Sequence, residues 1–153
     1  MTSVEQQLST AIAADATIQG LLATDPGGNL AFYDKQLPQQ NFNGAAFVQP
    51  CGVYQRISSP RLFVHTPVAS QANAGRARFQ LTFWGYDTVV LDQIDAAVLA
   101  VMRTFDAFNI PGSPPVFTQA PFIDYSSRTT IEPQTQPTLQ KVQIDVQFWF
   151  QDQ

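Results

Sequence analysis

The sequence predicts an α+β fold, in which a mainly antiparallel β-sheet carries two principal helices packed on one face. Three observations lead to this prediction. Apolar residues recur at helical spacing in two segments, apolar and polar residues alternate in the clearest of four strand-like segments, and the order is helix, strand, strand, helix, strand, strand. Amphipathic strands with one buried and one solvated face are typical of antiparallel sheets. We expect residues 1–153 to form a single domain.

The first helix is predicted to begin after Ser3, because Ser3 and Gln6 have the spacing of a capping box. Asp15 either ends this helix or caps a second short turn, and the sequence 25–29, with a proline and two glycines, stops the helical region. The apolar residues at helical spacing are Val4, Leu8, Ala11, Ile12, Ile18, Leu21 and Leu22.

Four strands are predicted, at 51–58, 77–85, 122–132 and 141–151, and alternation is clearest in the second and the fourth. In the first strand, Cys51 and Val53 face one side and Tyr54 faces the other. Between the second and third strands we expect the longest helix, capped by Asp87 or Thr88. Its apolar stripe is Val90, Ile94, Ala97, Val98, Val101, Met102 and Phe105. The segments 30–50, 59–75 and 109–121 are predicted to be irregular, and 133–137 a turn.

The composition favours a protein that assembles with other proteins. Only 13% of the residues are charged, about half the usual share, so there is little charge repulsion between copies. The net charge is −4, and Arg76 and Arg78 are the densest basic pair. Specific nucleic acid binding is therefore not expected.

The sequence offers no convincing catalytic or metal-binding group, so we expect no enzyme activity and no cofactor. His65 is the single histidine and lies in a proline-bounded segment, and Cys51, in register with apolar residues, reads as a buried thiol. One cysteine permits no disulfide within the chain. Asp92 and Asp95 are predicted to lie on a solvated helix face. Residues 1–7 lack the features of a signal peptide, and we expect no membrane helix.

Three aromatic residues are candidates for a protein interface. Trp84, Trp149 and Tyr54 are predicted to lie on the solvated faces of their strands, where neighbouring strands would bring them into one patch. The alternative is that loops or a helix cover this face.

The segment 53–58, VYQRIS, and the segment 76–87, RARFQLTFWGYD, followed by the helix with Ile94, Ala97 and Val98, resemble the tail completion, or tail terminator, proteins of long-tailed bacteriophages. The order of elements agrees with this family over nearly the whole chain. The loops at 30–50 and 109–121 depart from the compact form expected for the family.

The resemblance implies a structural virion protein that forms a ring, typically hexameric, on the end of the tail tube. Such a ring stops tube polymerisation and offers a docking face to the neck or connector of the head, and the genome passes through its lumen. The implied partners are further copies of the chain, the tail tube protein and the neck connector, with no membrane. The implied location is the tail-neck region of the virion, after assembly in the host cytoplasm.

We expect the aromatic candidates, with Arg76 and Arg78, to lie at a contact between subunits, at the tube contact or at the lumen. Two alternatives remain open: another phage neck or head-completion protein, and a small-molecule-binding α+β domain.

Overall fold

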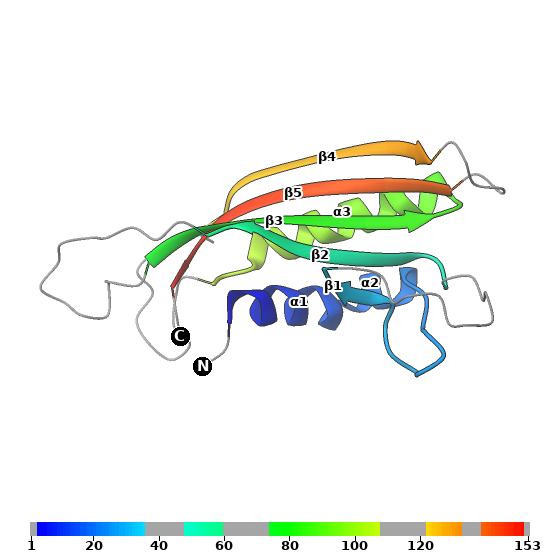
Figure 1. Cartoon of the computed structure of the whole chain (residues 1–153), viewed down its shortest axis with the longest axis horizontal. Coiled ribbons are helices and arrows are strands. Elements are labelled where there is room, and N and C mark those ends of the chain that lie inside the picture. The colour runs from blue at the N-terminus through cyan, green and yellow to red at the C-terminus, as the bar shows by residue number, and fades with distance from the viewer. Residues whose placement is uncertain (1–2, 36–47, 60–73, 108–121, 133–138, 152–153) are drawn as a thin grey trace, which may run out of the picture.

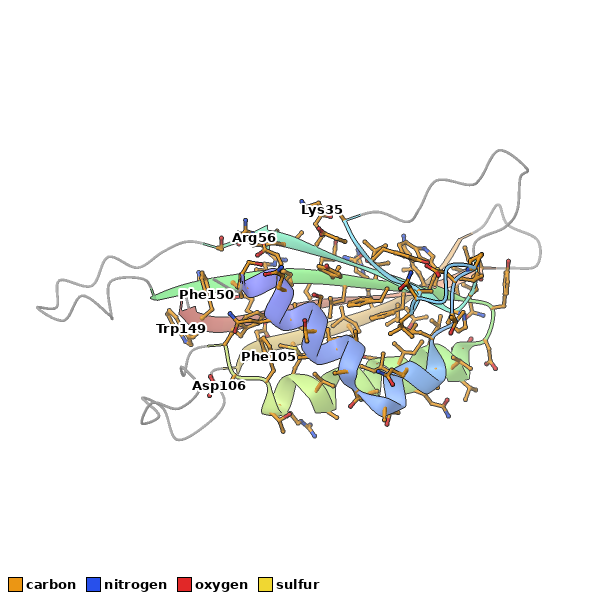
Figure 2. All side chains as sticks on the ribbon, turned by 90° about the horizontal axis from the view of Figure 1, so that it is seen from below. Lys35, Arg56, Phe105, Asp106, Trp149 and Phe150 are labelled. Carbon is orange, nitrogen blue, oxygen red and sulfur yellow. The ribbon has the colours of Figure 1, made fainter. Side chains whose placement is uncertain are left out.

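The computed structural model describes residues 3–35, 48–59, 74–107, 122–132 and 139–151. Its elements are, in chain order, α1 (Val4–Ala14), α2 (Ala16–Leu21), β1 (Phe32–Asp34), β2 (Cys51–Ser58), β3 (Ala74–Gly85), α3 (Thr88–Thr104), β4 (Phe122–Glu132) and β5 (Leu139–Gln151). The strands form one five-stranded sheet in the order β1-β2-β3-β5-β4, with the helices on one face (Figure 1, Figure 2). The predicted α+β class is confirmed.

The N-terminal helices begin where the sequence predicts. The Ser3 hydroxyl accepts the Gln6 N–H at 3.2 Å, and the Gln6 side chain accepts the Ser3 N–H at 3.2 Å, which completes the capping box. Asp15 ends α1 and caps α2, because its carboxylate accepts the Ile18 N–H at 3.0 Å. One residue therefore sets the bend between the two helices, and this bend keeps the apolar sides of both against the sheet.

The sheet is antiparallel except for β1, which runs parallel to β2. The sequence did not predict β1, since the segment 30–50 was expected to be irregular. Lys35, directly after β1, has a φ of 66°, in the left-handed region of the backbone. The strand β3 begins at Ala74, inside the predicted loop 59–75, because the ladder with β5 continues as far as Gln151.

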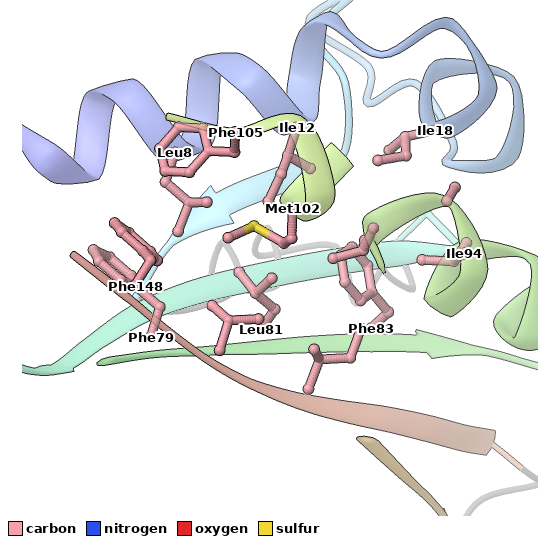
Figure 3. Packing of buried hydrophobic residues seen from close by; sticks show 14 of the residues in the cluster. Leu8, Ile12, Ile18, Phe79, Leu81, Phe83, Ile94, Met102, Phe105 and Phe148 are labelled. Atoms are coloured by element: carbon pink, nitrogen blue, oxygen red, sulfur yellow. The ribbon is translucent and has the colours of Figure 1, made fainter. Parts of the chain in front are cut away.

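The core lies between the helices and the inner face of β3 and β5 (Figure 3). Phe148 of β5 stacks on Phe79 of β3 with ring centroids 5.8 Å apart, and Phe105, after α3, meets Phe148 edge-on at 5.1 Å. The predicted stripe of α3 is largely confirmed. Leu91 was missed and is fully buried, whereas Val90 and Val101 are half-buried against the core.

Gly52 lets the core reach the edge of the sheet. A Cβ atom at this position would lie 2.4 Å from the ring of Phe83, closer than any side chain permits. Without that atom, the Phe83 ring fits over β2 and stacks on Phe32 of β1 with centroids 5.8 Å apart. This stack fixes the short edge strand β1 to the rest of the fold.

Candidate interaction surface

Two of the candidate residues are cross-strand partners at one end of the sheet face that none of the described helices covers (the uncovered face). The register places Arg76 of β3 opposite Trp149 of β5, and Arg78 follows on the same face. Both arginines are exposed, and the Trp149 ring is half-buried. Figure 2 shows Trp149 at the end of the molecule where β5 finishes. These three residues therefore form one group.

Trp84 belongs to the same face but lies at its opposite end. It pairs with Lys141 of β5 and follows Arg76 by eight positions along β3, which corresponds to roughly 26 Å of strand. The expected patch that joins Trp84 to Trp149 is therefore wrong in its geometry, although both rings are half-buried on the uncovered face.

Tyr54 lies on the other face of the sheet, so its predicted position on the solvated face is wrong. Its partner in β3 is Leu81, a core residue, and its ring packs against Phe32 at a centroid distance of 5.0 Å. The residues on the uncovered face of β2 are instead Cys51, Val53, Gln55 and Ile57, of which the first two are buried. The physical reason is that both sides of β2 carry apolar residues, so the pairing with β3, and not alternation, decides which side meets the helices.

Cys51 is a buried thiol, as predicted. Its exposed fraction is 1%, and burial raises the pKa of the thiol to about 11. The thiol is therefore protonated near neutral pH. His65, the base that a Cys51 nucleophile would need, lies outside the described residues.

A side-chain cluster that the sequence did not predict joins α3 to β4. Asp95 was expected on a solvated face, but it is half-buried, and its carboxylate accepts hydrogen bonds from the hydroxyls of Tyr125 and Ser127. The Ser127 contact is 2.7 Å, and the Tyr125 oxygen also lies 3.0 Å from the Asp95 carbonyl oxygen. Burial and the hydrogen bond to Asp95 raise the pKa of Tyr125. No local signal predicts this cluster, because its members are 30 and 32 positions apart.

Among the strands that the structure describes, β4 has a neighbour on one edge only. Near the opposite edge of the sheet, the Gly52 N–H donates to the Ala31 carbonyl and the Lys35 N–H donates to the Tyr54 carbonyl, each at 2.8 Å. The backbone N–H and C=O groups of even-numbered residues of β2 therefore point toward β1. Backbone groups alternate between the edges of a strand, and the register carries this alternation across the sheet. The β4 residues whose backbone N–H and C=O groups point away from β5 are Tyr125, Ser127, Thr129 and Ile131.

The uncovered face is polar over its middle. A groove of about 570 Å³ crosses β2, β3, β5 and β4 on this face, and its lining includes Ile57, Arg78, Gln80, Arg128, Gln143 and Asp145. Amide, hydroxyl and charged side chains dominate the groove. A surface of this composition suits a polar partner better than an apolar one.

A second groove of about 560 Å³ lies between the C-terminal ends of α1 and α3, where Ala11, Ala14 and Phe105 line it together with Asp15 and Asp106. Within the described residues, no group of three or more His, Cys, Asp or Glu side chains is arranged to hold a metal ion. Among the helices of the described ranges, none has the length and apolar character needed to cross a membrane.

No protein-family model matches this sequence, and no curated protein matches it. Among solved structures, the fold is similar to that of a chain in a structure described as "Virion of native gene transfer agent (GTA) particle", with a TM-score of 0.53 and 12% sequence identity. The match covers 98% of this chain and 96% of that chain. The likeness is one of fold, and it extends over almost the whole of both chains.

Proposed function

We propose that this chain is a structural protein of a phage-like particle, and that it caps the tail tube as a hexameric ring, ends tube polymerisation and provides the docking face for the neck connector. The observation that carries the proposal is the fold match to a chain of a virion particle, which spans 98% of this chain. The resemblance of the segments 53–58 and 76–87 to tail terminator proteins supports the finer assignment.

A ring needs two different surfaces on each subunit, because each copy contacts one neighbour through one patch and the other neighbour through another. The described residues offer chemically different surfaces, namely the polar uncovered face of the sheet and the helix layer on the opposite side. The low charge of the chain favours contact between identical copies. In this proposal Trp84, Trp149, Arg76 and Arg78 remain contact residues, while Tyr54 serves the packing of β1.

The proposal assigns no catalytic step and no cofactor to the chain. Its partners are further copies of itself, the tail tube protein and the neck connector, and its place is the tail-neck region of the particle after assembly in the host cytoplasm. Specific binding of nucleic acid and membrane association are not part of it.

Growth of tail tubes with and without the protein tests the proposal. We expect tube length to increase without limit when the protein is omitted, and growth to stop when it is added, with a ring visible on the tube end by electron microscopy. Tubes that reach the same length in both reactions, with bare ends, would contradict tube capping.

A neck or head-completion protein is the second candidate, because the matched structure is described as a whole virion particle. The two candidates differ in the structure that they bind first. A terminator binds isolated tubes in the absence of heads, whereas a head-completion protein binds filled heads in the absence of tubes. Co-sedimentation with each preparation separates them.

A further inference from the structure

Charge is distributed unequally between the two sides of this molecule. Among the described side chains on the uncovered face of β3, β5 and β4, four are basic, Arg76, Arg78, Arg128 and Lys141, and two are acidic, Asp124 and Asp145, a net of two positive charges. The other described side chains include three basic and eight acidic residues, a net of five negative charges. Among the described side chains, positive charge is therefore concentrated on this face.

The two arginines of the groove on this face are available to a partner. Arg78 and Arg128 are exposed, and the only polar contact of Arg128 with a described side chain is a long one, 3.5 Å, to Gln143. Elsewhere in the described residues, Arg56 pairs with Glu5 at 2.9 Å and Lys35 with Asp34 at 4.0 Å. Neither groove arginine is paired with a described carboxylate, although Asp145 also lines the groove.

The helix α3 presents a complementary surface on the opposite side of the molecule. Its buried residues face the sheet, and its solvent-facing side carries Val89, Asp92, Ala96, Ala100 and, in the last turn, Arg103 at helical spacing, all exposed. The two alanines allow a close approach, and Asp92 provides a carboxylate. Val89 is 62% exposed and Ile57 in the groove is 45% exposed, so each surface also carries an aliphatic side chain that a partner would cover.

We propose that neighbouring copies meet face to back: the exposed side of α3 of one copy lies in the basic groove of the next, with Asp92 directed toward Arg78 and Arg128. The contact joins two different patches, so it repeats from copy to copy and can close a ring. This contact rests on the proposed function in one respect, namely that the closed assembly is the tail ring. The opposite charges of Asp92 and the two groove arginines also fix the orientation of the subunits.

A charge-swap series tests this contact in the full-length protein by native mass spectrometry and light scattering. We expect the Arg128→Glu variant to raise the dissociation constant of the oligomer at least about tenfold, and high salt to weaken the wild-type oligomer in the same direction. Lys35→Glu makes the same charge change outside both surfaces and should leave the oligomer intact. The double variant Arg128→Asp with Asp92→Arg should recover assembly, and thermal unfolding of each variant verifies that it folds.

The outcomes separate this inference from the proposed function. An Arg128→Glu protein that assembles like wild type overturns the face-to-back contact and leaves tube capping intact. If wild type is monomeric in solution, the same variants are compared for rings on tube ends, and equal capping by Arg128→Glu overturns the contact. Salt-sensitive oligomers that fail to cap tubes overturn the proposed function alone. If the Arg128→Glu variant keeps the oligomer intact but loses binding to duplex DNA, measured by fluorescence anisotropy, the groove is assigned to nucleic acid. That result overturns the inference.

Discussion

The neighbouring strands β5 and β4 differ sharply in how they are held. In β5, every second side chain from Val142 to Phe150 is buried against the helices. In β4, none of the side chains described, 124–131, is buried. The two strands share an antiparallel ladder of hydrogen bonds, so the ladder alone does not distinguish them.

The difference shows that two kinds of interaction hold this sheet together. The strand β5 is held by apolar burial, which is the dominant favourable contribution in folding. The strand β4 depends on its ladder with β5 and on the hydrogen bonds that Asp95 accepts from Tyr125 and Ser127. Substitutions on the two strands should therefore have different sizes and different consequences.

The largest effect is expected for Phe148→Ala in β5. This side chain is 1% exposed and contacts the rings of Phe79 and Phe105. Its removal leaves a cavity in the core and should lower the free energy of unfolding by about 3–5 kcal/mol, measured by urea titration. Gln147→Ala, its neighbour on the polar face, is the control and should change stability little. Equal effects of the two substitutions would contradict the assignment of faces.

An intermediate effect is expected for Asp95→Ala. The substitution leaves the half-buried hydroxyl of Tyr125 without its carboxylate partner and should cost about 1–3 kcal/mol. Gln93→Ala, at an exposed polar position on the same helix, is the control. Hydrogen exchange measured by NMR should show that Asp95→Ala accelerates exchange in β4 more than in β5. A uniform change across both strands would argue against a local role.

A smaller contrast is expected within β4 of the wild-type protein before it assembles. The amides of Ser127 and Thr129 point away from β5, whereas those of Ser126 and Arg128 point toward it. The outward amides should exchange at least about tenfold faster than the inward ones. In β5 both sets should be protected, because this strand is paired on both edges. Equal protection along β4 would mean that its outer edge is already paired.

The smallest effect is expected for Ile131→Ala. The side chain is 61% exposed, so little burial is lost, and stability should change by no more than about 0.5 kcal/mol in urea titration. A loss comparable with that of Phe148→Ala would show that β4 has a buried side in solution, through contact with another copy.

The strong elements could be predicted from the sequence. The regular alternation of 141–151 and the helical stripe from Ile94 to Met102 follow from burial on one side, which leaves a local pattern. The capping box at Ser3 was equally readable, because all its members lie within one turn.

The surface could be predicted only in part, because it depends on which strands pair. Arg76 and Trp149 meet through the ladder of β3 with β5, and Tyr54 joins the core through the register of β2 with β3. Neither register follows from the sequence of a single strand. Asp95 escaped prediction for the same reason, since its partners come from a strand on the other side of a long connection.

The order of the strands also determines how this protein reaches its fold. The strand β5 follows the others in the sequence but lies between β3 and β4. Its register joins Gly85 to Gln140 and Ala74 to Gln151, pairs that are 55 and 77 positions apart. Closing such long loops costs entropy before any contact compensates, and topologies rich in distant contacts fold slowly. We therefore expect the pairing that gives the sheet its most buried strand to be also the step that limits the rate of folding.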